Sequence, residues 1–381
     1  MRRDAIGSTG DGPRRPPPVT PGLPGRYYVD PAIHEREKER LFYGKWLCAG
    51  RETDLPEPGH YLTRQVADER ILLVRGGDGA IRAFYNVCRH RGSLLCESAE
   101  GRVPGGGITC PYHAWTYALD GRLHATPHMT WPPDADRSEY SLHPVRVECW
   151  EGFVWINLSA AAPPLAGELG GLATGFARYG LGRLRRAHRV GYDVAANWKL
   201  LVENFSECYH CPGVHPALNR ASHYLGGGGP PREGERAWRG GAWMDLSPGW
   251  ATMSIRGERR RPTLPGLTED DARRVYYNTV YPNFFLSLHP DYAMAHTLWP
   301  VDVGHTRIVC EWLFAPEAIV EPGFDPGDAV EFWDLVNRQD WHACELAQIG
   351  NASRAHRAGV HVDQEAGPRY FTRFLLAELG D

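Results

Sequence analysis

The sequence predicts an α+β protein with two domains, a small all-β domain followed by a larger domain in which helices flank an antiparallel sheet. Three observations support this prediction. The chain has 381 residues, enough for two domains that each bury a core. Between residues 59 and 158, short alternating or apolar runs are separated by Gly-containing turns, which is typical of a small all-β domain. Later strand-like runs lie between helical segments without a βαβ alternation, which favours an antiparallel sheet.

The first part of the chain divides into three predicted segments. Residues 1–25 consist mainly of Pro, Gly and Arg, with almost nothing apolar, and are expected to form a disordered arm. Residues 26–45 are expected to carry a helix that packs on the larger domain, with Asp30 as its cap and Pro31 in its first turn. Residues 46–158 form the predicted all-β domain.

Residues 159–381 form the predicted larger domain. A helical pattern runs from about Asn197 to Tyr209, and strand-like runs such as VYYNTVY, NFFLSLH and TRIVCEWLF follow. An amphipathic helix is predicted from about Asp328 to Ile349. The Gly/Pro-rich residues 225–235 between these segments are interpreted either as a lid over a site or as a plain surface insertion.

Composition excludes several classes of protein. The 42 basic and 46 acidic residues give a formal net charge of −4, which argues against a nucleic-acid binder or a polybasic membrane-surface protein. No apolar run approaches the length of a membrane-spanning helix, and no export signal is visible. The nine cysteines are odd in number, so a disulfide framework is not expected. We therefore expect a soluble cytoplasmic protein whose 17 histidines and nine cysteines include metal ligands.

Two Cys-His pairs in the all-β domain form the first candidate metal site. Cys88 and His90 lie in one predicted loop, and Cys110 and His113 lie in another. A four-coordinate zinc site and a Rieske [2Fe–2S] cluster both need two thiolates and two imidazoles. Zinc fingers usually pair Cys with Cys and His with His, whereas here each loop carries one of each. The mixed pairing favours the two-iron cluster.

The sequence motifs around these residues support the same interpretation. CRHRG and CPYHAWTYALDGRL resemble the Rieske domain of ring-hydroxylating and related Rieske non-haem iron oxygenases, over most of residues 46–158. The 19 residues between His90 and Cys110 make a gap slightly longer than is usual in that family. The excess falls in the Gly-rich residues 101–107, where a surface insertion costs little.

A carboxylate-bearing helix that ends in histidines forms the second candidate site. On a helix, Glu203, Glu207 and His210 share one face, and buried carboxylates need partners. Pro212 and Gly213 end the helix and allow His215 to return toward His210. Asp340 is the single charge in the middle of the apolar stripe of the last long helix. It is either a helix-edge ion pair or the carboxylate of a 2-His-1-carboxylate iron site.

This second segment resembles the catalytic domain of the same oxygenase family, which implies a helix-grip, START-like fold. The resemblance implies that His210, His215 and Asp340 bind a mononuclear Fe(II). It also implies that Glu207 bridges the cluster of one subunit to the iron of its neighbour, with Asn204 as a further catalytic candidate. Glu in place of the more usual Asp, in the wording E-C-Y-H-C, is similar to the branch that acts on quaternary ammonium compounds such as betaines and carnitine.

Together, the two predicted sites imply a terminal oxygenase. NAD(P)H-derived electrons would pass through a separate reductase or ferredoxin to the cluster, then to the iron, and finally to O₂ and a small organic substrate. The resemblance also predicts a homotrimer. Three hypotheses stay open: hydroxylation or demethylation of a quaternary ammonium or N-methyl compound, oxygenation of an aromatic or secondary-metabolite scaffold, and a zinc-stabilised binding protein without turnover.

The substrate pocket is predicted from aromatic residues of the larger domain. Such a cluster can hold a trimethylammonium group by cation–π attraction, although 13 Trp and 17 Tyr residues will also supply aromatic side chains to an ordinary core. Cys208 and Cys211 are interpreted as small buried side chains, not as a zinc or redox pair. The pocket candidates are Phe205, Tyr281, Phe284, Trp299, Trp312 and Trp333.

Overall fold

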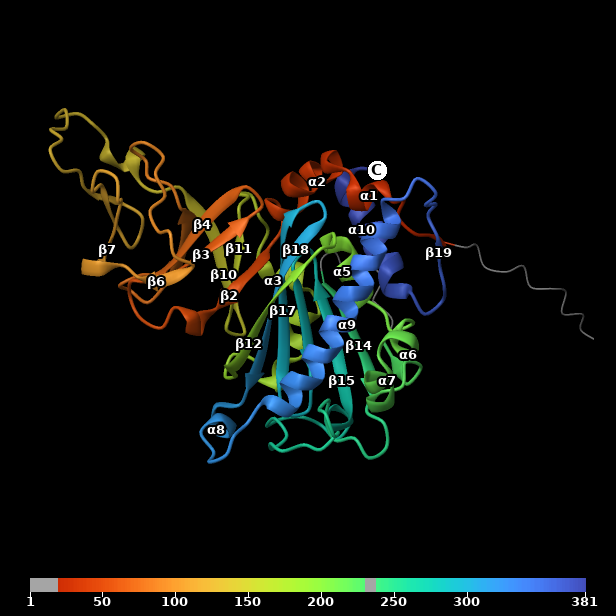
Figure 1. The fold of residues 1–381 in the computed structure, drawn as a ribbon. Coiled ribbons are helices and arrows are strands. Elements are labelled where there is room, and N and C mark those ends of the chain that lie inside the picture. Colours follow the sequence, from red (N-terminus) through yellow and green to blue (C-terminus); the bar gives the residue numbers. More distant parts are fainter. Residues whose placement is uncertain (1–19, 230–237) are drawn as a thin grey trace, which may run out of the picture.

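The computed structural model describes residues 20–229 and 238–381 and shows the predicted α+β architecture, with two seven-stranded antiparallel sheets (Figure 1). The first sheet contains, in spatial order, β2 (Leu47–Arg51), β11 (Phe153–Asn157), β10 (Pro144–Trp150), β5 (Ile81–Tyr85), β4 (Glu69–Arg75), β3 (His60–Val66) and β6 (Glu100–Arg102). The second sheet contains β12 (Arg185–Val194), β18 (His305–Phe314), β17 (Ala293–Asp302), β16 (Phe284–Leu288), β15 (Arg274–Val280), β14 (Trp238–Asp245) and β13 (Gly227–Gly228).

Two smaller sheets complete the strands. A three-stranded sheet joins β7 (Gly107–Thr109), β8 (Thr116–Ala118) and β9 (Leu123–Ala125), and β1 (Thr20–Pro21) pairs with β19 (Val360–His361). The expectation of a disordered arm is therefore wrong for residues 20–25, because they are anchored by this pairing and by the buried Leu23 side chain. Residues 1–19 of the predicted arm lie outside the described residues.

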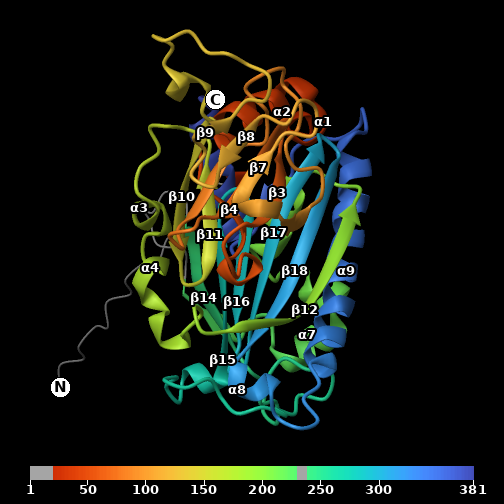
Figure 2. The same ribbon diagram turned by 90° about the vertical axis from the view of Figure 1, so that its left-hand side faces the viewer.

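Helices cover both faces of the second sheet (Figure 2). On one face, α5 (Trp198–Phe205) packs between α9 (Gly327–Asn351) and α10 (Ala366–Leu379), while α3 (Leu165–Leu169) and α4 (Leu172–Gly175) lie on the other. The other α-helices are α1 (Arg26–Val29), α2 (Pro31–Glu37), α6 (Cys211–Val214), α7 (Pro216–Ala221) and α8 (Pro316–Ile319). A π-helical turn spans Lys38–Phe42, and short 3₁₀ turns span Glu52–Asp54, Pro104–Gly106, Arg137–Tyr140, Ala177–Tyr179 and Asp271–Arg273.

Burial on both faces explains the continuous apolar runs of the central strands. All five residues of β16 are buried, and so are the four central residues of β4. A strand covered on both faces needs apolar side chains at every position, whereas a strand with one solvated face alternates. One hydrophobic cluster includes residues of both sheets, from Leu62 and Val154 to Trp312, so the two sheets share a core.

The helix predicted over Asn197–Tyr209 is shorter in the structure. Its first turn is capped by the Asn197 side chain, which accepts a hydrogen bond from the Lys199 N–H at 3.0 Å. The helix ends at Phe205, after which the chain turns toward α6. This early end is important because it places the following residues in a turn rather than on one helical face.

No helix in the described part of the chain is both long enough and apolar enough to cross a bilayer. The longest, α9, has a mixed surface with Asp, Glu, Arg and Gln along its length.

Candidate functional site

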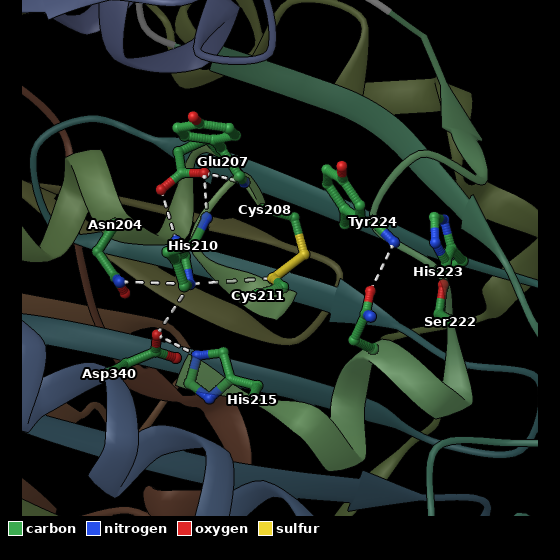
Figure 3. Close-up of a disulfide and its surroundings, with 12 residues drawn as sticks. Asn204, Glu207, Cys208, His210, Cys211, His215, Ser222, His223, Tyr224 and Asp340 are labelled. Carbon is green, nitrogen blue, oxygen red and sulfur yellow. Dashed lines mark hydrogen bonds and ion pairs between the residues drawn. A yellow bond between two sulfur atoms is a disulfide. The ribbon is translucent and has the colours of Figure 1, made fainter. Parts of the chain in front are cut away.

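Three ligand-type side chains meet where α9 passes the turn between α5 and α7 (Figure 3). The ligand atoms of His210, His215 and Asp340 all lie within 4.8 Å of one another. Asp340 Oδ1 is 2.7 Å from His215 Nε2 and 3.2 Å from His210 Nε2. His215 is buried and the other two are half-buried, so the group forms at the protein interior with one side facing a cavity.

Neighbouring acceptors orient both imidazoles. His210 Nδ1 lies 2.5 Å from Glu207 Oε1, and His215 Nδ1 lies 2.8 Å from Gln339 Oε1. Each Nδ1–H therefore donates outward, which leaves both Nε2 atoms directed at the shared point. Carboxylate and carbonyl partners of this kind fix the tautomer of metal-binding histidines. Sequence reasoning did not identify Gln339, although it directly precedes Asp340.

The electrostatics of this group favour a positive charge. Burial by itself lowers the pKa of His210, but hydrogen bonds with Asp340 and Glu207 outweigh it and raise the pKa to about 10. Burial raises the pKa of Asp340, and the two histidines more than reverse that effect, so it stays below its usual range. Two imidazoles and one carboxylate that attract a cation fit a divalent iron, and such a triad leaves coordination positions open.

Glu207 also shapes the turn that carries His210. Its carboxylate accepts hydrogen bonds from the backbone N–H groups of Tyr209 and His210, the latter at 3.3 Å. This local capping competes with continuation of the helix, and it accounts for the end of α5 at Phe205. The same side chain therefore positions the turn and orients the imidazole.

The four Cys-His residues of the first domain lie in two loops, one after β5 and one after β7. Each loop closes on itself, because the Gly92 N–H donates to the Cys88 carbonyl and the Ala114 N–H donates to the Cys110 carbonyl, both at 3.0 Å. Gly92 adopts a φ of +71°, a conformation that favours glycine. The two loops thus present their side chains in the same way.

These loops bury their thiols and expose their imidazoles. Cys88 and Cys110 are buried and interact with each other, whereas the rings of His90 and His113 lie 4.7 Å apart at the surface. Among the described residues, only His210, His215 and Asp340 form a group of three ligand atoms that all lie within 4.8 Å of one another. No three of the four Cys-His ligand atoms lie that close together. A tetrahedral zinc ion would draw all four ligand atoms to one point, whereas two irons spread them. The arrangement therefore fits a two-iron cluster better than zinc.

A cavity of about 440 Å³ opens beside the His-His-Asp group. The cavity is lined by residues of several helices and strands, including α5, α7, β14, β15, α9 and the start of α10. The ligand-type side chains Glu207, His210, His215 and Asp340 lie along its wall, together with Asn204. A small molecule in this cavity would contact the metal-binding group directly.

Comparisons with known proteins match both domains. Residues 45–141 match the Rieske [2Fe–2S] domain, and residues 181–380 match the catalytic domain of the ring-hydroxylating alpha subunit. The chain is 31% identical to the glycine betaine monooxygenase oxygenase subunit of Pseudomonas aeruginosa, over 89% of this chain and 84% of the relative. It is 39% identical to the carnitine monooxygenase oxygenase subunit of Acinetobacter baumannii, over 90% and 88%.

The chain belongs to the Rieske oxygenase alpha subunits. It is the oxygenase component of a multi-component oxidoreductase that uses a Rieske [2Fe–2S] cluster and a mononuclear iron. Among solved structures, a quaternary ammonium Rieske monooxygenase in complex with L-carnitine has a TM-score of 0.78 at 28% identity, covering 95% of this chain and 96% of that one. Naphthalene 1,2-dioxygenase, at 19% identity and a TM-score of 0.75 over 94% of each chain, shares the fold.

The aromatic residues predicted for the substrate pocket of this Rieske oxygenase divide into two groups. Phe205, Tyr281 and Trp333 line the cavity, whereas Phe284, Trp299 and Trp312 do not. Sequence reasoning missed Tyr224, Trp243 and Tyr277, which also line it.

The pleat of β16 explains one of these errors. Phe284 packs edge-on against Phe153 and Trp155 at 5.0 and 5.1 Å, in the core between the two sheets. Its neighbour Phe285 points to the opposite face and stacks on Phe205 with ring centroids 4.2 Å apart. The sequence run Phe284-Phe285 does not indicate which ring packs against the cavity residue Phe205, because both positions are fully buried.

Trp312 and Trp299 also lie outside the cavity lining. Trp312 is fully buried and lies edge-on to His188 at 5.7 Å, away from the cavity lining. Trp299 lies toward the far end of β17, where its indole N–H donates to Thr297 at 3.3 Å. The predicted lid over residues 225–235 lies partly outside the described residues, and of its described part Gly227, Gly228 and Gly229 line the cavity.

The interpretation of Cys208 and Cys211 as separate buried side chains is wrong. The structure joins them in a disulfide with a Cα–Cα distance of 5.0 Å, and both line the cavity (Figure 3). Because α5 ends at Phe205, the two cysteines lie across a tight turn. Cys211 Sγ is 3.9 Å from His210 Nε2, so the bond braces the turn that carries this imidazole.

Glu203 is a partly buried carboxylate near the metal-binding group. Both of its oxygens accept hydrogen bonds from the Tyr28 hydroxyl, at 2.8 and 2.9 Å, and it lines a second cavity of about 210 Å³ that also contacts Glu207 and His210. Burial raises its pKa to about 7, although Tyr28 and the nearby Lys199 ammonium oppose the increase. Folding thus favours the protonated form of this side chain.

Raising the pH from 5 to 8 should lower the free energy of unfolding of the wild type. We expect this decrease to be smaller in the Glu203→Gln variant. A carboxyl whose folded-state pKa exceeds its unfolded value of 4.5 stabilises the fold when protonated, and this contribution is lost as the pH rises through 7. The wild type should therefore lose about 2–3 kcal/mol more than the variant over this range. Urea unfolding at both pH values tests this, with the exposed Glu321→Gln as the matched control. Equal pH dependence in the three proteins would contradict it.

Proposed function

We propose that this Rieske oxygenase inserts one oxygen atom into a small quaternary ammonium or N-methylated compound. The observation that carries the proposal is the aromatic lining of the cavity beside the metal-binding group. Rings of this kind attract a desolvated trimethylammonium group through their negative faces. The relatives named for glycine betaine and carnitine support the same substrate class. The lining rings are those of Phe205, Tyr224, Trp243, Tyr277, Tyr281 and Trp333.

The site residues have the following proposed roles. His210, His215 and Asp340 hold the mononuclear iron, and Glu207 and Gln339 orient the two imidazoles through their Nδ1 atoms. Asn204 lies beside His210, with its Nδ2 atom 3.5 Å from Nε2, and can donate a hydrogen bond to a ligand in the cavity. The ligands proposed for the cluster are Cys88, His90, Cys110 and His113.

When bound, the two iron sites would supply electron transfer and the activation of O₂. The chain contributes position and environment. The aromatic rings hold the ammonium group, so that a carbon attached to the nitrogen lies near the metal-binding group. Hydroxylation of such a carbon, followed by cleavage of its C–N bond, releases an aldehyde. The second oxygen atom leaves as water and requires two electrons and two protons for each turnover.

We also propose that electrons cross between subunits of a homotrimer. In Figure 1 the loops beside β7 that carry the Cys-His pairs lie at the opposite end of the molecule from α6, which begins beside His210. His90 and His113 are exposed, as required of groups that dock on another subunit. Glu207, hydrogen-bonded to His210, is the proposed bridge to the neighbouring cluster. A closed ring repeats this head-to-tail contact.

The electrons are proposed to come from NAD(P)H through a separate reductase or ferredoxin, which would place the system in the cytoplasm. Purified protein should then be red-brown, with about three irons and two acid-labile sulfides per chain and a rhombic EPR signal on reduction. Zinc without colour would instead support a zinc-stabilised binding protein.

Turnover tests the substrate class. With a reductase and NADH, we expect O₂ uptake and aldehyde release to be stimulated by trimethylammonium compounds and not by neutral aromatic compounds of similar size. The panel should include choline, glycine betaine, carnitine, indole and naphthalene. Stimulation by the aromatic compounds alone would contradict the proposal and favour an aromatic scaffold as substrate.

A further inference from the structure

One strand carries two hydroxyl groups to the wall of the substrate cavity. Tyr277 and Thr279 of β15 both line the cavity, and they lie two residues apart. Alternate residues of a strand point to the same face of a sheet. Tyr276, the residue before them, points to the opposite face, where its hydroxyl donates to Asp271 at 2.9 Å. The Tyr277 and Thr279 side chains therefore belong to the cavity face of the strand.

Neither hydroxyl has a protein partner in the part of the chain that the structure describes. No residue there forms a hydrogen bond with the side-chain oxygen of Tyr277 or of Thr279. Thr279 is only 5% exposed, and a buried hydroxyl group without a partner is costly. Because both residues line the cavity, a molecule inside the cavity can supply the missing partner.

The surroundings of Tyr277 hold its ring in place and keep its hydroxyl a donor. In the sheet, Tyr277 lies directly opposite Ala242 on β14 and Ser287 on β16, two small residues that leave room around the ring. The ring packs edge-on against Phe205, with centroids 6.1 Å apart. Burial raises the pKa of the Tyr277 phenol above its usual value, and the Asp340 carboxylate adds to this increase. The hydroxyl is therefore protonated at neutral pH.

These hydroxyl groups add a second kind of contact to an aromatic cavity. Aromatic rings attract an ammonium group through their faces, but they do not distinguish the other substituents that the ligand carries. A hydroxyl group donates a hydrogen bond only to an acceptor, such as the oxygen of an alcohol or of a carboxylate. A substrate with both an ammonium group and such an oxygen is held at two points, which fixes its direction in the cavity.

We infer that Tyr277, with Thr279 beside it, binds an oxygen function of the substrate by hydrogen bonds and thereby determines specificity. The inference rests on the proposed function. It narrows that function from quaternary ammonium compounds in general to those that also carry a hydroxyl or carboxylate oxygen. Tetraalkylammonium compounds without such an oxygen can contact the rings, but they leave both hydroxyl groups unpaired. An unpaired donor in the cavity lowers the affinity for such a ligand.

Ligand binding to the iron-loaded protein tests the inference without turnover. Choline and propyltrimethylammonium form a matched pair, because they share the trimethylammonium group and have nearly the same length, but only choline contains an oxygen. Trp243 and Trp333 line the cavity, so tryptophan fluorescence reports occupancy, and calorimetry gives a second readout. Tyr277→Phe keeps the ring and removes only the hydroxyl. We expect its affinity for choline relative to propyltrimethylammonium to fall about 5–10-fold, with the affinity for propyltrimethylammonium unchanged.

Glycine betaine tests a carboxylate in the same assay. A larger loss for glycine betaine than for choline in Tyr277→Phe would identify a carboxylate as the bound oxygen function, and the reverse would identify a hydroxyl. Thr279→Val, a second variant of nearly the same shape, should lower the same affinities in the same direction. Tyr276→Phe is the matched control, because it removes a hydroxyl from the opposite face of the same strand and should keep the wild-type preference.

Unchanged affinities for choline and glycine betaine in both Tyr277→Phe and Thr279→Val would overturn the inference and leave the proposed function standing. An equal loss of preference in Tyr276→Phe would reveal a general effect of the strand and would also overturn it. Failure of every quaternary ammonium ligand to bind the wild type would instead overturn the proposed function itself.

Discussion

Replacing His210 by alanine is expected to lower oxygenation to about 1% of the wild-type rate or less, while the visible spectrum of the Rieske cluster stays intact. Loss of a partner that only orients a metal ligand already costs about 10–100-fold, so loss of a ligand should cost more. His210 supplies one of three ligand-type atoms within 4.8 Å, and the cluster loops lie in the other domain.

Metal content and spectra measured with the rates give the decisive readouts. Iron should fall by about one atom per chain, with sulfide unchanged. His342→Ala, which removes an exposed imidazole from α9, should keep full activity and full iron content. Bleaching of the cluster spectrum in His210→Ala would contradict the assignment of two separate sites.

The His210→Ala variant also tests electron transfer between subunits. Cys88→Ser should lose the cluster and, by itself, be inactive, because electrons no longer enter. When Cys88→Ser and His210→Ala chains are co-expressed, some interfaces in a mixed trimer pair an intact cluster with an intact iron site, so part of the activity should return. Absence of recovery in mixed oligomers, or a fully active monomer by light scattering, would contradict the inter-subunit route.

Lys199→Met is expected to lower the free energy of unfolding by about 3–5 kcal/mol, because it leaves a buried carboxylate without its cation. Lys199 Nζ lies 2.6 Å from Glu37 Oε1, and both side chains are fully buried. The indole N–H of Trp198 donates to the other Glu37 oxygen at 2.9 Å. Burial favours a raised pKa for Glu37, but the Lys199 ammonium together with hydrogen bonds from His34, Lys199 and Trp198 outweighs burial and keeps that pKa below its usual value.

Denaturant unfolding of three variants measures this effect. Lys38→Met is the matched control, because Lys38 pairs with the exposed side chains of Glu35 and Asp68 and should cost no more than about 1 kcal/mol. The double variant Lys199→Met/Glu37→Gln removes both charges and should recover part of the loss. A cost for Lys199→Met no larger than that for Lys38→Met would contradict a stabilising role of the buried pair. The pair fastens α2 to α5 and thus supports the metal-binding turn.

Short-range patterns were sufficient to predict much of the fold and the grouping of His210, His215 and Asp340. Each Cys-His pair lies within one loop, and loop geometry is decided by nearby residues such as Gly92. The helix over Asp328–Ile349 was predicted from its apolar stripe and closely matches α9. Asp340 was found because it was the only charge inside that stripe. Such features depend on spacings of a few residues, which a sequence displays directly.

The end of α5 and the lining of the pocket could not be predicted in this way. Apolar periodicity continues past Phe205, but the Glu207 side chain caps the following turn and stops the helix. The resulting turn brings Cys208 and Cys211 together in a disulfide. In β16 both phenylalanines are buried, and only the position of the strand between two covering layers decides that Phe285 and not Phe284 packs against the pocket residue Phe205.

The sequence by itself determined the types of ligand, their grouping and the family. Only the tertiary structure decided which distant residues meet, as when Tyr28 reaches Glu203, Glu37 pairs with Lys199 and Gln339 orients His215. The physical reason is that local spacing constrains side chains a few residues apart through the geometry of one turn or helix. Contacts across more than 100 residues depend instead on strand register and on the packing of α2 and α9 around α5.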